Sequence, residues 1–319
     1  MKKFVMVLMA SLALSVQAKE VPAELVGRNI TVIVPYGPGG NSDITARQLA
    51  RGVEQTTGLS VIVVNRPGAS GIVGTQQLLQ AEPNGLTLGQ FETGPAMVNA
   101  IQGLPNAPSR EQLIPVSASI ESSLALIVSA DVAIGSVQDF MRWLQQKDRA
   151  NYATVGGIQT LMTEALLDTA KVRSVRGVTY KSQAETLRSV VSGETAFVLA
   201  SVGDAQSLID AGRLKVLAVG SRVRSPLLPT VPALTEIYPG FVTVNYNGVF
   251  APRGTPLHIV NYLNWAWAQA VADPSVHTSL VARHNVPLGG SVEQARHYYN
   301  SYYDSRRSLF QQYRHLLPN

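Results

Sequence analysis

The order of apolar and polar positions predicts short buried strands that alternate with amphipathic helices. The first unit is the apolar run Thr31–Val34, which Pro35 ends and three glycines follow. A run of β-branched apolar residues is typical of a strand buried on both faces. The next helix is expected to begin at Ser42 and Asp43, which are good N-cap residues, and to end at Gly58. A strand, a glycine turn and a helix start together predict a cradle for an anion.

A second copy of this plan follows directly. The strand Val61–Val64 runs into the loop Pro67–Gly71, and a helix is expected over Ile72–Ala81. Glycines occur in many strand-to-helix turns, so one loop alone is a weak signal. Neighbouring parallel strands present such loops at the same carboxyl edge of a sheet, where open α/β sheets bind ligands. The two adjacent loops therefore favour one site for an anionic ligand.

The rest of the chain repeats the alternation of strands and helices. Strands are expected at Leu86–Phe91, Ile114–Ser119, Leu124–Ser129, from Tyr152, and at Gly177–Lys181, Ala196–Ala200, Leu214–Val219 and Phe241–Phe250. Helices are expected at Ala133–Arg149, from Gly157 to Ala170, and at Ala184–Gly193, Ala205–Ala211, Pro256–Ala272, Pro274–His284 and Val292–Leu317. This alternation predicts parallel sheets. We expect two α/β domains, residues 19–122 with 241–319 and residues 123–240, joined by two crossing strands that act as a hinge.

The N-terminus carries an export signal. Two lysines precede the apolar run Phe4–Leu14, and Val16-x-Ala18 resembles a cleavage site. Residues 1–18 therefore predict a signal peptide that is cleaved after Ala18 and an exported protein. The alternative, a membrane anchor, is disfavoured because the apolar run is short for a bilayer.

Composition excludes several classes. The chain has no cysteine, which excludes disulfides, thiolate metal sites and thiol nucleophiles. Removing Lys2 and Lys3 lowers the formal charge from +5 by two, to +3. This mild charge, without a basic block, does not favour nucleic acid as a partner.

Three motifs stand out along the chain: Val34-Pro35-Tyr36-x-Pro38-Gly39-Gly40-x-Ser42-Asp43, Val64-Asn65-Arg66-Pro67-Gly68-Ala69-x-Gly71 and Gly248-Val-Phe-Ala-Pro-Arg-Gly254. They resemble motifs of the Bug family, the periplasmic solute receptors of tripartite tricarboxylate transporters, and the resemblance implies a periplasmic location. The resemblance covers nearly the whole mature chain. It implies a type II periplasmic-binding fold with a ligand cleft between two α/β domains. It also implies a small carboxylate ligand held largely by backbone N–H groups and water, and integral-membrane permease subunits as partners. A sensor kinase is the alternative partner.

The loops and the resemblance together predict the ligand-binding residues. They are Tyr36, Gly39, Gly40, Asn41, Ser42, Asp43, Gly68, Ala69, Ser70, Gly71, Thr93, Gly156, Gly157, Gln159, Tyr180, Ser201 and Tyr246. One region departs from the family pattern, because Ile158, Gln159 and Met162 are bulkier than the residues the family has there, and they are expected to reshape the pocket. Glu92, at the end of the third strand, would repel a second carboxylate or attract an amino group if it faces the cleft.

Enzymatic alternatives have weak support. The first loop is not Gly-x-Gly-x-x-Gly, and Asn65 stands where a dinucleotide site needs an acidic residue. Ser70 lies in Gly-Ala-Ser-Gly and not in a Gly-x-Ser-x-Gly elbow. No spacing of histidines or acidic residues predicts a metal site. We therefore expect a monomeric binding protein with no catalytic residue, cofactor or metal.

Overall fold

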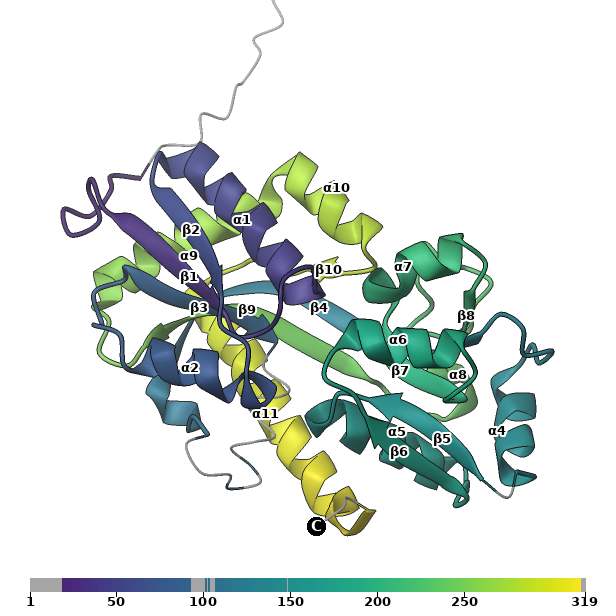
Figure 1. Ribbon diagram of the computed structural model, residues 1–319. Coiled ribbons are helices and arrows are strands. Elements are labelled where there is room, and N and C mark those ends of the chain that lie inside the picture. The colour runs from purple at the N-terminus through teal and green to yellow at the C-terminus, as the bar shows by residue number, and fades with distance from the viewer. Residues whose placement is uncertain (1–18, 93–100, 102, 104–106, 148, 317–319) are drawn as a thin grey trace, which may run out of the picture.

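The computed structural model describes residues 19–316, apart from positions 93–100, 102, 104–106 and 148. Figure 1 shows two lobes side by side, joined at the centre by long strands. In the described part of the chain, no helix combines the length and apolar character that a membrane span requires.

The elements alternate as expected. The strands are β1 (Asn29–Val34), β2 (Ser60–Asn65), β3 (Thr87–Glu92), β4 (Leu113–Ser129), β5 (Ala150–Thr154), β6 (Val175–Thr179), β7 (Phe197–Ser201), β8 (Leu214–Ala218), β9 (Val244–Pro252) and β10 (Val286–Pro287). The helices are α1 (Asn41–Thr57), α2 (Ile72–Leu79), α4 (Val137–Gln145), α5 (Gly157–Thr169), α6 (Gln183–Val191), α7 (Val202–Asp210), α8 (Leu234–Ile237), α9 (Leu257–Ala272), α10 (Pro274–Ala282) and α11 (Val292–Tyr313). The short 3-10 turns are η1 (Ala69–Gly71), η2 (Arg110–Gln112) and η3 (Arg314–Leu316).

One continuous sheet path runs through both lobes in the order β2-β1-β3-β9-β4-β7-β5-β6, and β8 and β10 also pair with β4. In the first lobe β1 pairs in parallel with β2 and β3, whereas β9 is antiparallel to β3 and β4. In the second lobe β5 is parallel to β6 and β7. The strands β4 and β9 pass between the lobes in Figure 1, which matches the expected pair of crossing strands. The residue limits of the two domains stay a prediction.

The expectation of two strands between residues 114 and 129 was wrong, because β4 is one strand. Ser122 and Ser123 continue the ladder opposite Asn245 and Val244, and the next residues pair with β7 and β8. Residues 121 and 122 are polar because their side chains have polar partners. Glu121 accepts a hydrogen bond from Tyr302, and Ser122 donates to Glu92.

Two helix starts also differ from expectation. Gly40 is the N-cap of α1, so Ser42 and Asp43 lie inside its first turn. The helix expected from Ala133 starts only at Val137, because the Ser136 hydroxyl accepts the Asp139 N–H at 3.1 Å and caps it there.

Each lobe has its own core. On one face of the first sheet α1 and α9 pack over Ile30, Val32 and Leu88, and Trp267 is among the largest side chains enclosed there. On the other face α11 packs its tyrosines against Tyr246 and Phe250. The second lobe encloses Phe140, Tyr152 and Phe197, among others. The core of the first lobe fixes the strands β1 and β2, at whose carboxyl ends the two glycine loops begin.

Candidate ligand-binding cleft

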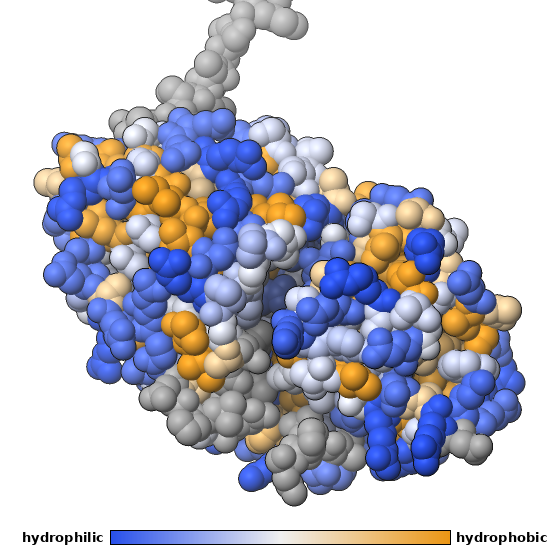
Figure 2. Space-filling model, viewed as in Figure 1, coloured by the Kyte–Doolittle hydropathy of each residue, from blue (hydrophilic) through white to orange (hydrophobic). Residues whose placement is uncertain are grey.

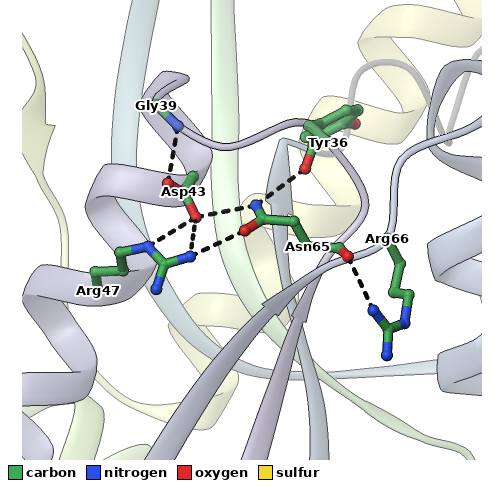
Figure 3. A network of polar contacts seen from close by, with 6 residues as sticks. All are labelled: Tyr36, Gly39, Asp43, Arg47, Asn65 and Arg66. Atoms are coloured by element: carbon green, nitrogen blue, oxygen red, sulfur yellow. Dashed lines mark hydrogen bonds and ion pairs between the residues drawn. The ribbon is translucent and has the colours of Figure 1, made fainter.

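The loop before α1 is held in place by Asp43. Its Oδ2 accepts the Gly39 N–H at 2.9 Å, and its Oδ1 accepts bonds from Arg47 Nε at 3.0 Å and Asn65 Nδ2 at 2.9 Å. Asn65 also donates to the Tyr36 carbonyl at 3.0 Å, so the loop is tied to the end of β2 (Figure 3). Gly39 has φ +83°, a conformation that side chains disfavour. Asp43 and Asn65 therefore brace the loop from within the first lobe, and the sequence pattern did not predict this role for Asn65.

The negative charge of Asp43 is balanced within the network by Arg47. Burial acts to raise the pKa of Asp43, but the hydrogen bonds from Arg47, Gly39 and Asn65 outweigh it and keep the pKa below its usual value. Arg47 is engaged with Asp43 and Asn65. Arg66 lies exposed, and donates to Gln77 at 3.1 Å and to the Asn65 carbonyl at 3.2 Å (Figure 3). Arg47 is thus paired with the carboxylate of Asp43, whereas the two partners of Arg66 are neutral.

The second glycine loop meets the first through Tyr36. A Cβ on Gly71, which has φ +91°, would lie 3.2 Å from Tyr36 Cε1, and the Tyr36 hydroxyl donates to the Glu92 carbonyl at 3.1 Å. Ala69 also adopts a positive φ of 46°. The predicted residues Tyr36, Gly68, Ala69 and Gly71 thus gather at the carboxyl edge of the first sheet. Ser70 belongs to the short turn η1 of this loop, and Thr93 lies outside the described residues.

A buried polar layer lies beneath the N-terminus of α1. Asn247 Nδ2 donates to Ser42 Oγ at 2.9 Å, and Gln90 Nε2 donates to Asn247 Oδ1 and to Ser119 Oγ. All four side chains are at most 5% exposed. Ser42 was among the predicted residues, whereas Asn247 and Gln90 were not, although the alternation Asn245-Tyr246-Asn247 places the two asparagines on one face of β9.

Across the cleft, the second lobe contributes the N-terminus of α7. The Asp204 carboxylate, in the first turn of α7, accepts a hydrogen bond from the Asn41 N–H at the start of α1. The side chain of Asn41 donates to Glu92 and to Asn285 Oδ1, the latter at 3.0 Å. Arg283 Nη2 donates to the Gly203 carbonyl at 3.3 Å. Asn41 therefore lies between an acidic residue of its own lobe and one of the other lobe.

These two carboxyl groups are hard to ionise. Burial, together with the nearby charge of Asp204, raises the pKa of Glu92 to about 7, against the opposing hydrogen bonds from Ser122 and Asn41. Burial also raises the pKa of Asp204 to about 6, and Arg283 and the Asn41 N–H limit the rise. The position of Glu92 at a strand end indicated a possible role from the sequence, whereas nothing in the local pattern around Asp204 distinguishes it from an ordinary helix residue.

The hollow between the lobes is visible from outside. Figure 2 shows a recess at the centre of the molecule, with mostly hydrophilic residues around it. Figure 1 places the N-terminal end of α1 and the start of α7 on its two sides. Of the predicted residues, Gly39, Gly40, Asn41 and Ser42 lie on the α1 side, and Ser201, the buried N-cap residue of α7, lies on the other.

Tyr246 does not belong to the cleft, contrary to expectation. Its ring is fully buried beside Tyr298 and Tyr302 of α11, with centroid distances of 6.0 Å and 5.7 Å. Side chains alternate between the two faces of a strand, so Tyr246 projects away from Asn245 and Asn247. Tyr246 therefore contributes to the core between β9 and α11 and not to the ligand site.

The side chains of Gln159 and Tyr180, two of the predicted residues, form hydrogen bonds with other residues of the second lobe. Gln159 Oε1 accepts the Val155 N–H at 2.6 Å, and its Nε2 donates to Gln183 and to the Leu199 carbonyl. The Tyr180 hydroxyl donates to Glu194 at 2.8 Å, beyond the end of α6. Gly156 and Gly157 open α5 at the end of β5. Their role in binding, like that of the other predicted contacts, stays a prediction.

The departures from the family pattern do not line the cleft as expected. Ile158 and Met162 are 4% and 1% exposed and belong to the core of the second lobe. Their bulk fills that core beside Phe197 and Leu199. In the residues that the structure describes, no group of three or more histidine or acidic side chains is arranged to hold a metal ion.

Comparison with known proteins agrees with this geometry. The model of the family described as "Tripartite tricarboxylate transporter family receptor" matches residues 45–312. The chain belongs to this family. The expected Bug resemblance and two-domain periplasmic-binding fold are thereby confirmed, and membership of a receptor family makes the chain a binding protein and not an enzyme.

Relatives of the receptor span nearly its whole length. A UPF0065 protein of Bordetella bronchiseptica is 30% identical over 89% of this chain and 83% of its own. Protein BugT of Bordetella pertussis is 28% identical over 90% and 88%. Among solved structures, Rpa4515 of R. palustris with adipate has a TM-score of 0.84 at 26% identity and covers 90% of this chain and 97% of its own. Periplasmic binding protein BugD, at 22% identity and TM-score 0.81, supports the fold.

Proposed function

We propose that the receptor works in the periplasm, captures a small carboxylate between its lobes and delivers it to the permease subunits of a tripartite tricarboxylate-type transporter. The observation that carries the proposal is the contact at the start of α1. There a backbone N–H of the first helical turn donates to a carboxylate of the opposite lobe, that of Asp204. The helix end therefore has the chemistry that a ligand carboxylate needs, because its first N–H groups lack acceptors within the helix and its dipole favours negative charge.

The relatives support the same class of ligand. The structure of Rpa4515, which is 26% identical to this chain, holds adipate, a dicarboxylate. The family description names a tricarboxylate transporter. We infer export from the N-terminal signal, with cleavage after Ala18 and a mature chain that starts at Lys19.

Binding is tested with the purified mature protein and a panel of small carboxylates. A ligand at 100 times its Kd stabilises the folded state by about 2.7 kcal/mol, which shifts the Tm of a chain of this size by several degrees. Calorimetry then gives the affinity, and mass analysis should recover the ligand unchanged. Failure of every carboxylate to shift the Tm, or chemical conversion of a bound one, would overturn the receptor role.

Delivery to a transporter is tested in cells. Deleting the gene should abolish uptake of the radiolabelled ligand, and a copy with the native signal should restore it. Normal uptake combined with loss of a ligand-dependent transcriptional response would instead indicate a sensor kinase as partner.

A further inference from the structure

We propose that Glu92 and Asp204 form a subsite for a positively charged amino group, so that the receptor prefers amino-substituted carboxylates to simple ones. This inference rests on the proposed function and specifies its ligand. The two acidic residues come from opposite lobes and meet at Asn41, which donates its side-chain amide to Glu92 and its backbone N–H to Asp204. A ligand between them would hold the lobes together.

The strand register places a third acceptor, the side chain of Asn245, on the same face of the sheet as Glu92. Glu92 is paired with Asn247 across β3 and β9, and Ser122 is paired with Asn245 across β4 and β9. Residues directly opposite in an antiparallel pair project from the same face, so all four side chains share one face. Two contacts confirm it, because Ser122 Oγ donates to Glu92 Oε1 at 3.4 Å and Asn247 donates to Ser42 of α1.

Asn245 supplies the observation that points to a ligand. Its side chain is 2% exposed, and its Oδ1 has no hydrogen-bond partner among the described residues. A buried acceptor without a donor is unfavourable, by about 1–3 kcal/mol. The Asn245 side chain lies on the same face of the sheet as Glu92 and is paired with Ser122, which contacts Glu92, so we infer that a donor bound by Glu92 also satisfies this oxygen. An ammonium group brings three donors and no acceptor.

The charge balance favours the same group. The subsite holds two carboxylates, and the cation that acts on Asp204 is Arg283. The hydrogen-bond donors that stabilise ionised Glu92 are the neutral Ser122 and Asn41. One added positive charge would compensate the second carboxylate. Burial is the main reason that both pKa values are raised, and the charge of Asp204 adds to it for Glu92. A second ligand carboxylate at this position would meet like charge.

The test compares probes that differ only by an amino group. Succinate is compared with aspartate, and adipate with 2-aminoadipate, by calorimetry on the mature protein at pH 7.5. The amino acid of each pair should bind about 10- to 100-fold more tightly, as expected for charge-assisted hydrogen bonds in a buried site. Equal or tighter binding of the simple dicarboxylates would overturn the subsite while leaving the carboxylate receptor intact.

Variants assign the preference to the two residues. Glu92→Gln and Asp204→Asn, singly and together, should reduce the preference at least about tenfold, chiefly by weakening the amino acid. Asp131→Asn, an exposed residue in the second lobe, is the matched control and should keep it. A preference that survives in folded single variants contradicts the assignment.

A diamine separates the two proposals. Putrescine has two amino groups and no carboxylate. If it binds in a manner that depends on Glu92 and Asp204, while no carboxylate binds, the amino subsite stands and the carboxylate receptor falls. If none of the probes binds, both fall.

Discussion

Gly39 and Gly40 are adjacent, yet their backbones predict opposite effects of substitution. Gly39 has φ +83°, whereas Gly40, the N-cap of α1, has φ −75°, which any residue adopts. The nearest atom to a Cβ on Gly40 is the Gly37 carbonyl oxygen at 3.9 Å. Gly40→Val should therefore fold, with a loss of about 1 kcal/mol from a poorer N-cap, and its methyl groups should weaken carboxylate binding about 10-fold or more by occupying space before the helix end.

Gly39→Val is the contrast. Its positive φ should lower the free energy of unfolding by about 1–3 kcal/mol. Urea unfolding and calorimetry of both variants separate the two effects. If Gly40→Val binds the best carboxylate normally while Arg66→Ala abolishes binding, an ion pair holds the ligand and the helix cradle does not.

Asp43 is predicted to stabilise the loop in a pH-dependent way. Asp43→Asn replaces an anionic acceptor, bonded to Arg47, Asn65 and the Gly39 N–H, with an amide that must turn a donor toward one of them. It should lower the free energy of unfolding at pH 7 by about 1–3 kcal/mol. The pKa of Asp43 is lowered in the fold, so its contribution is present above the unfolded pKa of about 4 and is lost as the pH falls through the folded value.

Urea unfolding at several pH values from 7 to 3 measures this. The difference between the original protein and Asp43→Asn should shrink as the pH falls. The exposed Asp131→Asn should show little difference at any pH, and a constant difference for Asp43→Asn would mean that packing and not charge is lost.

For single residues, the sequence predicted those that lie in the loops but not the distant residues that contact them. Asp43 and Tyr36 sit in short motifs whose geometry is local, so their places followed from neighbours in the chain. Asn247 reaches Ser42 from 205 positions away through the packing of α1 on the first sheet, and Asp204 reaches Asn41 from 163 positions away through the packing of the two lobes. Tyr246 was misplaced because an aromatic residue on a strand fits a core and a cleft equally well until the face is known.

Helix α7 of the second lobe contacts the first lobe at its first turn. Gly203, in its first turn, lies so close to the first lobe that an added Cβ would be 2.7 Å from the Arg283 carbonyl oxygen. The obstacle is backbone, so the two segments must separate. Gly203→Ala should lower the free energy of unfolding by about 1–3 kcal/mol and open the cleft, seen as a larger radius of gyration in small-angle scattering.

Gly135→Ala is the control, since a Cβ there meets nothing within 4 Å and its φ is not positive. An unchanged radius and stability for Gly203→Ala would show that the contact between α7 and Arg283 does not set the closure of the lobes.

Elements were predictable wherever their burial followed a simple period. The helices after each glycine loop were found because their apolar faces recur every three to four residues. β4 was divided in two because its polar centre serves the hinge: Glu121 bonds to Tyr302 and Ser122 to Glu92. Such polar side chains interrupt the apolar pattern and so predict the end of a strand, although the backbone pairing with β9 continues through them.

For the whole molecule, the acidic residues of the cleft predict that stability depends on pH. The pKa of Glu92 is raised to about 7 and that of Asp204 to about 6. A carboxyl group with a raised pKa is more stable in the fold below its unfolded pKa of about 4, and that stability is lost as the pH rises through the folded value. The ligand-free receptor should therefore lose about 1–3 kcal/mol of this contribution between pH 5 and pH 8, after allowance for partial exposure.

The informative measurement compares the original protein with the double variant Glu92→Gln/Asp204→Asn in urea at each pH. His284, which contacts Gln206 across the lobes, has a pKa lowered by burial and so acts in the opposite direction. It is present in both proteins, so subtracting one stability from the other removes it. The double variant should gain relative stability steadily from pH 5 to pH 8. An amino acid ligand should abolish that gain, because its ammonium group stabilises both carboxylates in ionised form. If the free energies of unfolding of the two proteins change equally with pH, ionisation of Glu92 and Asp204 does not destabilise the ligand-free receptor.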